Sequence, residues 1–199
     1  METIDSIMVI TLGIGRGIEH GIFTSILENR PKEIIYLASL TSMNTAERVK
    51  EVFAAHPQYH QPPEEVVTLT DETSLKDVYE KTLSAFKMAK NKGYAWEQII
   101  LDFTCGTKVM SAGAVLAAFL HGCKRLVYVG GSQKDDAGKT VDGSEEIVQP
   151  AGDLLDTYQE QFKQQLLDKG FSPQQVETIL EVFQREQIFS LRRVIQTVS

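Results

Sequence analysis

The 199-residue sequence contains only two cysteines, Cys105 and Cys123, and lacks any Cys-x-x-Cys pair or Cys/His cluster. Two cysteines make no disulfide framework, so a reduced, cytoplasmic setting is expected. A metal-ligand spacing is also missing from the four histidines, which are His20, His56, His60 and His121. The sequence therefore predicts neither a metal site nor a bound cofactor.

Long apolar runs are absent as well. The longest candidate, Val109 to Leu120, is shorter than the roughly 18 residues that a bilayer-spanning helix needs, and it contains Ser111 and Gly113. The first five residues are acidic and lead directly into a predicted strand, which is not the pattern of a secretion signal. No membrane association is expected.

Positive charge is scarce. Lysine and arginine together number 20 against 27 acidic residues, which gives a formal net charge of -7. Proteins that bind long DNA or RNA usually carry a basic field, so such a partner is disfavoured. A small anionic ligand needs only a few local donors and stays open.

Alternating apolar and helical segments dominate the first three quarters of the chain. Short runs rich in Val, Ile and Leu predict strands at 6–11, 33–39, 66–70, 98–103 and 125–129. Helical spacing predicts helices at 18–28, 44–55, 74–91 and 109–120. Residues 145–148 are expected to return beside 125–129 as a hairpin. This is the pattern of an α/β fold, a Rossmann-like, mostly parallel sheet with helices on both faces.

The composition changes after Gly152. Helices are predicted at 153–169, from Ser172-Pro173 onward, and from Ile188. The expected organisation is therefore a ligand-binding domain at 1–150 followed by a short helical C-terminal segment or linker at 153–199. The chain ends on an apolar helical pattern, which favours a truncated protein with more chain beyond Ser199.

Ligands of open parallel sheets bind at the carboxyl ends of the strands, which points to the loops at Gly13, Ser39 and Thr104. The loop Thr104-Cys105-Gly106-Thr107-Lys108 combines two hydroxyls, a glycine and a lysine at the start of a predicted helix. Unpaired amides and the helix dipole favour an anion there. The alternative is a capped turn with a solvated lysine. The spacing is not that of a P-loop.

The other two loops give weaker signals. Leu12-Gly13-Ile14-Gly15-Arg16 resembles the start of a dinucleotide fingerprint, but Ile18 replaces the third glycine and Ser39 stands where a ribose-binding acid is expected. NAD binding is therefore disfavoured, while Arg16 could pair with a phosphate. Ser39, Thr41 and Ser42 either contact ligand or cap the next helix.

Two residues of the fourth strand end need separate mention. Asp102 either orients the side chains of the following loop or faces the sheet edge, and the sequence leaves both open. Cys105 would be reactive if its thiol were activated by the helix N-terminus. No histidine lies near it in the sequence, so we interpret it as a small filler residue.

The segment Asp102-Phe103-Thr104-Cys105-Gly106-Thr107-Lys108-Val109-Met110-Ser111 resembles the D-x-T-G-G-T-K-x-M-S signature of CARF domains, the CRISPR-associated Rossmann-fold sensors of type III CRISPR systems. The departure is Cys105 in place of glycine. The resemblance covers about residues 5–150 and is specific only in the signature.

This resemblance implies a homodimer that binds cyclic oligoadenylate, as cyclic tetra- or hexa-adenylate, across its two-fold axis and thereby controls an effector in antiviral defence. It implies ligand contacts at Thr104, Cys105, Gly106, Thr107, Lys108 and Met110, and more loosely at Leu12–Arg16 and Ser39–Ser42. Ile14 and Met110 are candidates for adenine pockets. No effector motif is visible in the sequence, so the effector is expected on a C-terminal extension.

Three other functions stay open from the sequence. A ring nuclease would use Lys108 with Thr104 or Thr107 to cleave the bound ring without metal. A transcriptional regulator would use 153–199 as a helix-turn-helix, although Arg192-Arg193 is the only basic cluster there. A generic nucleotide-binding Rossmann domain is the last alternative.

Overall fold

The computed structural model describes residues 5–131, 144–148 and 152–186. The described strands form a six-stranded sheet in the order β3-β2-β1-β4-β5-β6. Neighbouring strands are parallel except β6, which runs antiparallel to β5. The strands are β1 (Ile7–Leu12), β2 (Glu33–Ala38), β3 (Glu64–Thr68), β4 (Ile99–Cys105), β5 (Arg125–Gly131) and β6 (Glu145–Val148).

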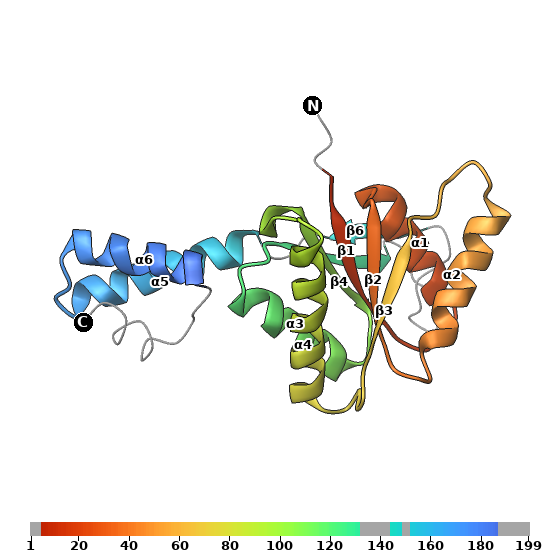
Figure 1. The fold of residues 1–199 in the computed structure, drawn as a ribbon, viewed down its shortest axis with the longest axis horizontal. Helices are drawn as coiled ribbons and strands as arrows, with labels where there is room; N and C mark the ends of the chain where they lie inside the picture. Colours follow the sequence, from red (N-terminus) through yellow and green to blue (C-terminus); the bar gives the residue numbers. More distant parts are fainter. Residues whose placement is uncertain (1–4, 132–143, 149–151, 187–199) are drawn as a thin grey trace.

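Helices cover both faces of the sheet, as predicted (Figure 1). Successive strand residues point to opposite faces, so each central strand feeds two cores. On one face Met8 and Ile10 pack under α1 (Ile18–Asn29) and α2 (Met43–Ala55). On the other, Val9 packs under α3 (Leu75–Asn91) and α4 (Lys108–Leu120). Double coverage explains why these strands read as continuous apolar runs rather than alternating ones.

Three strand predictions needed correction by two residues. β5 continues through Gly131, whereas its predicted end is residue 129. β3 begins at Glu64, two residues before the predicted start, because it is the edge strand and can expose acidic side chains. β4 starts after a 3-10 turn, η1 (Trp96–Gln98), and continues two residues further than predicted, through Thr104 and Cys105. The beginning of the signature is therefore strand, not loop.

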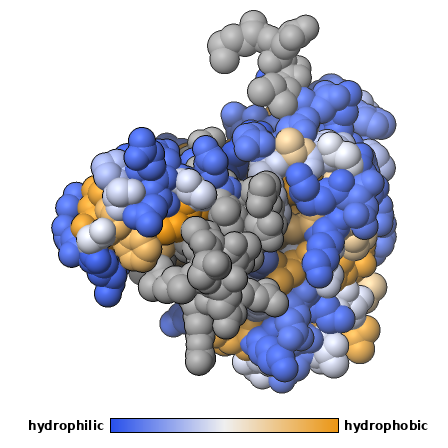
Figure 2. Space-filling model, turned by 60° about the vertical axis from the view of Figure 1, so that its left-hand side comes forward, coloured by the Kyte–Doolittle hydropathy of each residue, from blue (hydrophilic) through white to orange (hydrophobic). Residues whose placement is uncertain are grey.

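The C-terminal segment forms a helical hairpin of α5 (Gly152–Asp168) and α6 (Pro173–Glu186), which extends away from the sheet (Figure 1). Its own small core consists of Leu166, Val176 and Ile179. Figure 2 shows apolar surface between the hydrophilic sides of this hairpin. The helix predicted from Ile188 lies outside the described residues. None of the described helices is long and apolar enough to cross a membrane.

Candidate functional site

The chain reverses its direction of strand addition at β1, which lies between β2 and β4. The helix after β1 packs on one face of the sheet, and the helix after β4 packs on the other. The chain therefore leaves Leu12 and Cys105 at the same carboxyl edge and continues into helices on opposite faces of the sheet. This is the topological switch point, where open α/β sheets bind their ligands.

The two loops touch through their backbones. A Cβ atom added to Gly13 would lie 2.0 Å from the carbonyl oxygen of Cys105. One added to Gly106 would lie 2.8 Å from Cβ of Met110 and 3.1 Å from Oγ1 of Thr11. Neither glycine has a positive φ, so close packing, rather than a left-handed backbone, requires them. The loops after β1 and β4 form one structural unit.

A register shift shapes the end of β4. Ile10 pairs with Asp102, but Leu12 pairs with Cys105, so β4 contains one extra residue at this point. The hydroxyl of Thr104 accepts a hydrogen bond of 2.7 Å from the amide of Val129 on β5. Thr104 thereby replaces a backbone link between β4 and β5, and its side chain is anchored in the sheet.

Asp102, the first residue of the signature, is fully buried. Its Oδ1 accepts a hydrogen bond of 2.8 Å from the amide of Thr104. Burial raises the pKa of the Asp102 carboxyl, against the lowering influence of the Ser25 hydroxyl and of Thr104. Of the two roles that the sequence left open, the structure supports orientation of the loop.

The start of α4 carries the donors expected for an anion site. The Thr107 hydroxyl accepts a hydrogen bond of 3.1 Å from the amide of Met110 and so caps the helix. The amides of Lys108 and Val109 make no hydrogen bond with any described residue. The Lys108 side chain is exposed, and no ion pair joins it to the described residues. Two amides and one cation are therefore free to bind.

Two predicted contact residues lie in the interior. Met110 is fully buried against Leu69 and Val78. Cys105 is 6% exposed, and burial raises the pKa of its thiol well above the usual range. Cys105 is therefore a packing residue, and its thiol is no nucleophile. Their side chains shape the loop from below and do not form its surface.

Ser39, Thr41 and Ser42 form a cluster of hydroxyls after β2. The Ser42 hydroxyl accepts a hydrogen bond of 2.9 Å from the Ser39 amide, and the Ser39 and Thr41 hydroxyls are 2.8 Å apart. Of the two capping candidates, Ser42 occupies the N-cap position of α2. Its side chain makes no cap bond because it is bonded within the turn.

The loop after β1 presents exposed side chains. Ile14 is 67% exposed, and Arg16 is exposed without an ion pair among the described residues. On the inner side, the Thr45 hydroxyl donates to the carbonyl oxygen of Gly13 at 2.8 Å. Nη1 of Arg48 donates to that of Gly15 at 2.9 Å. Sequence reasoning missed Thr45 and Arg48, because nothing in a generic amphipathic helix marks residues that contact a loop 33 positions away.

Directly after β2 the chain carries Ser39, where a dinucleotide-binding fold has a ribose-binding acid. Ser39 is buried and is bonded within its turn, so it does not provide a carboxylate for a ribose. In the described ranges, no three His, Cys, Asp or Glu residues gather closely enough to hold a metal ion. The chemistry available is that of amides, two cations and apolar side chains.

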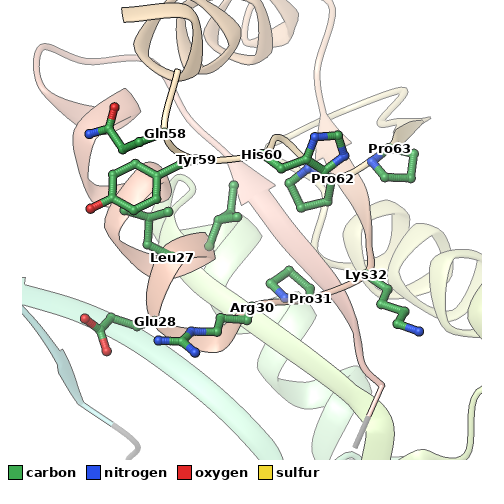
Figure 3. Close-up of a pocket in the computed structure, with 11 residues that line it drawn as sticks. Leu27, Glu28, Arg30, Pro31, Lys32, Gln58, Tyr59, His60, Pro62 and Pro63 are labelled. Carbon is green, nitrogen blue, oxygen red and sulfur yellow. The ribbon is translucent and has the colours of Figure 1, made fainter. Parts of the chain in front are cut away.

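A pocket of about 620 Å³ lies at the opposite, amino edge of the sheet. Figure 3 shows Glu28, Arg30 and Lys32 along one side of it and Tyr59 and His60 along the other. It opens between the end of α1 and the connector that precedes β3. Its charged side chains have both signs and do not converge on one point, and it lies away from the strand ends where such sheets bind ligands.

No protein-family model and no curated protein matches the chain. Solved structures similar to it include protein VC1899 from Vibrio cholerae, at 14% identity over 63% of this chain and 30% of that chain (TM-score 0.48). A type III CRISPR defence DNA nuclease activated by cyclic oligoadenylate is 14% identical, and the match covers 98% of this chain and 30% of the nuclease chain (TM-score 0.49). Can2 from Sulfobacillus thermosulfidooxidans, in complex with cyclic tetra-adenylate, is 20% identical, and the match covers 64% of this chain and 31% of the Can2 chain (TM-score 0.44).

The chain thus spans about 30% of the length of these structures. At identities of 20% or less and TM-scores below 0.5, the likeness carries no information on the ligand or activity of this chain. Those have to follow from the residues at the switch point.

Proposed function

We propose that this chain is a sensor domain that binds cyclic oligoadenylate and regulates an effector. The observation that carries the proposal is the signature itself, folded as a strand-to-helix turn with the free amides of Lys108 and Val109 and the exposed Lys108 side chain. These groups suit a phosphate of a cyclic RNA. The neighbouring loop adds a second exposed cation, Arg16, which makes no ion pair within the described ranges, and exposed Ile14, against which a base can pack.

We further propose that the sensor acts as a homodimer through the outward side of α4. After Lys108 this helix contains no charged residue, and Leu116 on its outer side is 40% exposed. On the same face of the sheet, Tyr128 is 42% exposed and contacts Phe103, with ring centroids 5.8 Å apart. A helix that is apolar all round is typical of burial on both sides. Two copies with a net charge of -7 meet with least repulsion where charge is absent.

Cleavage of the ring is not part of the proposal. The hydroxyl oxygens of Thr104 and Thr107, which a ring nuclease would use, already accept hydrogen bonds from the amides of Val129 and Met110. This arrangement favours holding a ligand over cutting it. We therefore expect mass spectrometry to recover intact rings after hours of incubation with the protein. Linear products in amounts that depend on protein concentration would establish the nuclease instead.

The direct test is titration calorimetry with cyclic tri-, tetra- and hexa-adenylate, with NAD and ATP as competing nucleotides. We expect at least one ring to bind at micromolar protein concentration and NAD and ATP not to bind. No heat with any ring would reject the sensor. Binding of NAD or ATP alone would identify a generic nucleotide-binding domain.

A matched pair of lysine variants locates the site. Lys108→Ala removes the free cation at the start of α4 and should weaken ring binding by more than tenfold, since a hydrogen bond to a charged group contributes about 1.5–3 kcal/mol. Lys87→Ala removes an exposed lysine on α3 and should leave the affinity unchanged. Equal affinities of the two variants would show that the ring binds elsewhere.

A further inference from the structure

We infer that Thr45 and Arg48 are positioning residues for the ligand: they hold the loop after β1 with its amides turned outward. The two residues, called here the α2 clamp, lie one helical turn apart on α2. The inference rests on the proposed function, because the ligand that the loop would meet is the proposed cyclic oligoadenylate. It adds residues that lie outside both the signature and the loop.

The α2 clamp is a connected set of hydrogen bonds. The Thr45 hydroxyl donates to the carbonyl oxygen of Gly13 at 2.8 Å and accepts from Nη2 of Arg48 at 3.1 Å. Nη1 of the same guanidinium donates to the carbonyl oxygen of Gly15 at 2.9 Å and lies 3.1 Å from Oε2 of Glu19 on α1. Thr45 is 2% exposed, so its hydrogen bond to Gly13 forms out of water, where hydrogen bonds are stronger. The hydrogen bonds of Arg48 are partly buried.

These bonds determine where the loop amides point. In a trans peptide the carbonyl and the following N–H point in opposite directions, and the described chain has no cis peptide. Because the carbonyls of Gly13 and Gly15 point at α2, the amides of Ile14 and Arg16 point away from it. Neither amide makes a hydrogen bond with a described residue. The clamp thus leaves two donors in an exposed stretch that ends in a free cation.

The charge balance supports a positioning role over direct contact. Glu19 neutralises Arg48, and both side chains are largely covered, with exposed fractions of 16% and 30%. The guanidinium is therefore occupied by the carbonyl oxygen of Gly15, the Thr45 hydroxyl and the Glu19 carboxylate. Arg16, by contrast, is exposed and makes no ion pair with a described residue. Gly13 also packs on the backbone of Cys105, so the clamp positions the signature loop indirectly.

The test compares hydroxyl loss with hydroxyl retention, using cyclic tetra-adenylate as the probe. Thr45→Val keeps the shape but loses the bond to Gly13, and we expect about tenfold weaker binding. Thr45→Ser keeps the hydroxyl and should bind within about twofold of wild type. Glu19→Gln removes only the ion pair and should behave like Thr45→Ser. Arg48→Met should resemble Thr45→Val, and the double variant should lose little more than either because the two act as one unit.

A purely structural role would lower the melting temperature without changing the affinity of the folded protein. Amide NMR spectra separate a structural from a positioning role. Titration of the wild type with cyclic tetra-adenylate should shift the amide signals of Ile14 and Arg16. In Thr45→Val these shifts should be lost, while the amide of Lys108 still responds. Two results would overturn this inference and leave the proposed function standing. One is a folded Thr45→Val variant with the affinity of the wild type, and the other is a bound wild type whose Ile14 and Arg16 amides do not respond. If Thr45→Val does not fold, Arg48→Met and the wild-type titration decide. A wild type that binds no cyclic tetra-adenylate removes the inference through its premise.

Discussion

At the scale of single residues, the unusual one is Asp102, a carboxyl without exposure in a core of apolar strands. Such a group is retained at an energetic cost, since burial penalises its charged form. Its hydrogen bond to the amide of Thr104 orients the residue that joins β4 to β5. The cost of burial is thus located directly beneath the candidate site.

The raised pKa of Asp102 predicts a pH dependence of stability. The folded protein holds this proton more tightly than the unfolded chain, so this contribution is fully present below the ordinary value of 3.8 and is lost as the pH rises through the raised pKa. Asp102→Asn keeps an oxygen for the Thr104 amide and removes the titration. Relative to wild type, its free energy of unfolding should therefore improve from acidic to neutral pH, as measured by urea denaturation.

Asp71 is a control of opposite sign. Hydrogen bonds from the Thr73 side chain and backbone hold the pKa of its carboxyl below the usual range, so its contribution is present above the ordinary pKa and is lost on acidification. Asp71→Asn should therefore become less damaging as the pH falls. If Asp102→Asn followed the same trend as Asp71→Asn, the carboxyl of Asp102 would not be the buried group described here.

At the scale of elements, the beginning of α4 depends on one side chain. Thr107 caps the helix through the amide of Met110, and loss of a cap costs about 1 kcal/mol. We expect Thr107→Ala to lower the free energy of unfolding by about that amount and Thr107→Ser to be neutral. Thermal denaturation of both variants checks this. Equal destabilisation by alanine and serine would mean that the methyl group, not the hydroxyl, is what Thr107 contributes.

Elements were the level at which the sequence was most informative. Apolar runs and helical spacing are local, so the strands, the helices and even the returning β6 could be predicted from them. The acidic start of β3 at Glu64 could not, because only its place at the sheet edge lets Glu64 belong to a strand. For Ser42 the sequence left helix capping and ligand contact open, and its hydroxyl is instead taken by the Ser39 amide of the same turn, three residues away.

The candidate site was predicted in its composition but not in its bonding. The sequence placed Thr104 near the end of the fourth strand and Lys108 near the start of the next helix, and the structure has them there. The Thr104 hydroxyl accepts a hydrogen bond from the amide of Val129, 25 positions away. This bond depends on which strand lies beside β4. The bond from Thr45 to Gly13 spans 32 positions and likewise follows from topology. Pairings at such separations leave no trace in local spacing.

At the scale of the whole molecule, the outward side of α4 predicts the oligomeric state. Leu116→Glu places a charge in the middle of a surface without charge and should shift the protein from dimer to monomer in analytical ultracentrifugation. Tyr59→Glu changes an equally exposed side chain at the opposite edge and should leave the dimer intact. A wild type that sediments as a monomer at all concentrations would argue against a two-fold site.

The hydrogen bond between Thr104 and Val129 connects the candidate ligand edge to the strands that lead into the C-terminal helices. β5 pairs with β6, and α5 begins shortly after β6 in the sequence. Because close-packed interiors transmit strain, we expect a ligand that displaces the signature to displace β5 as well. Through β6, that displacement would reach the hairpin of α5 and α6.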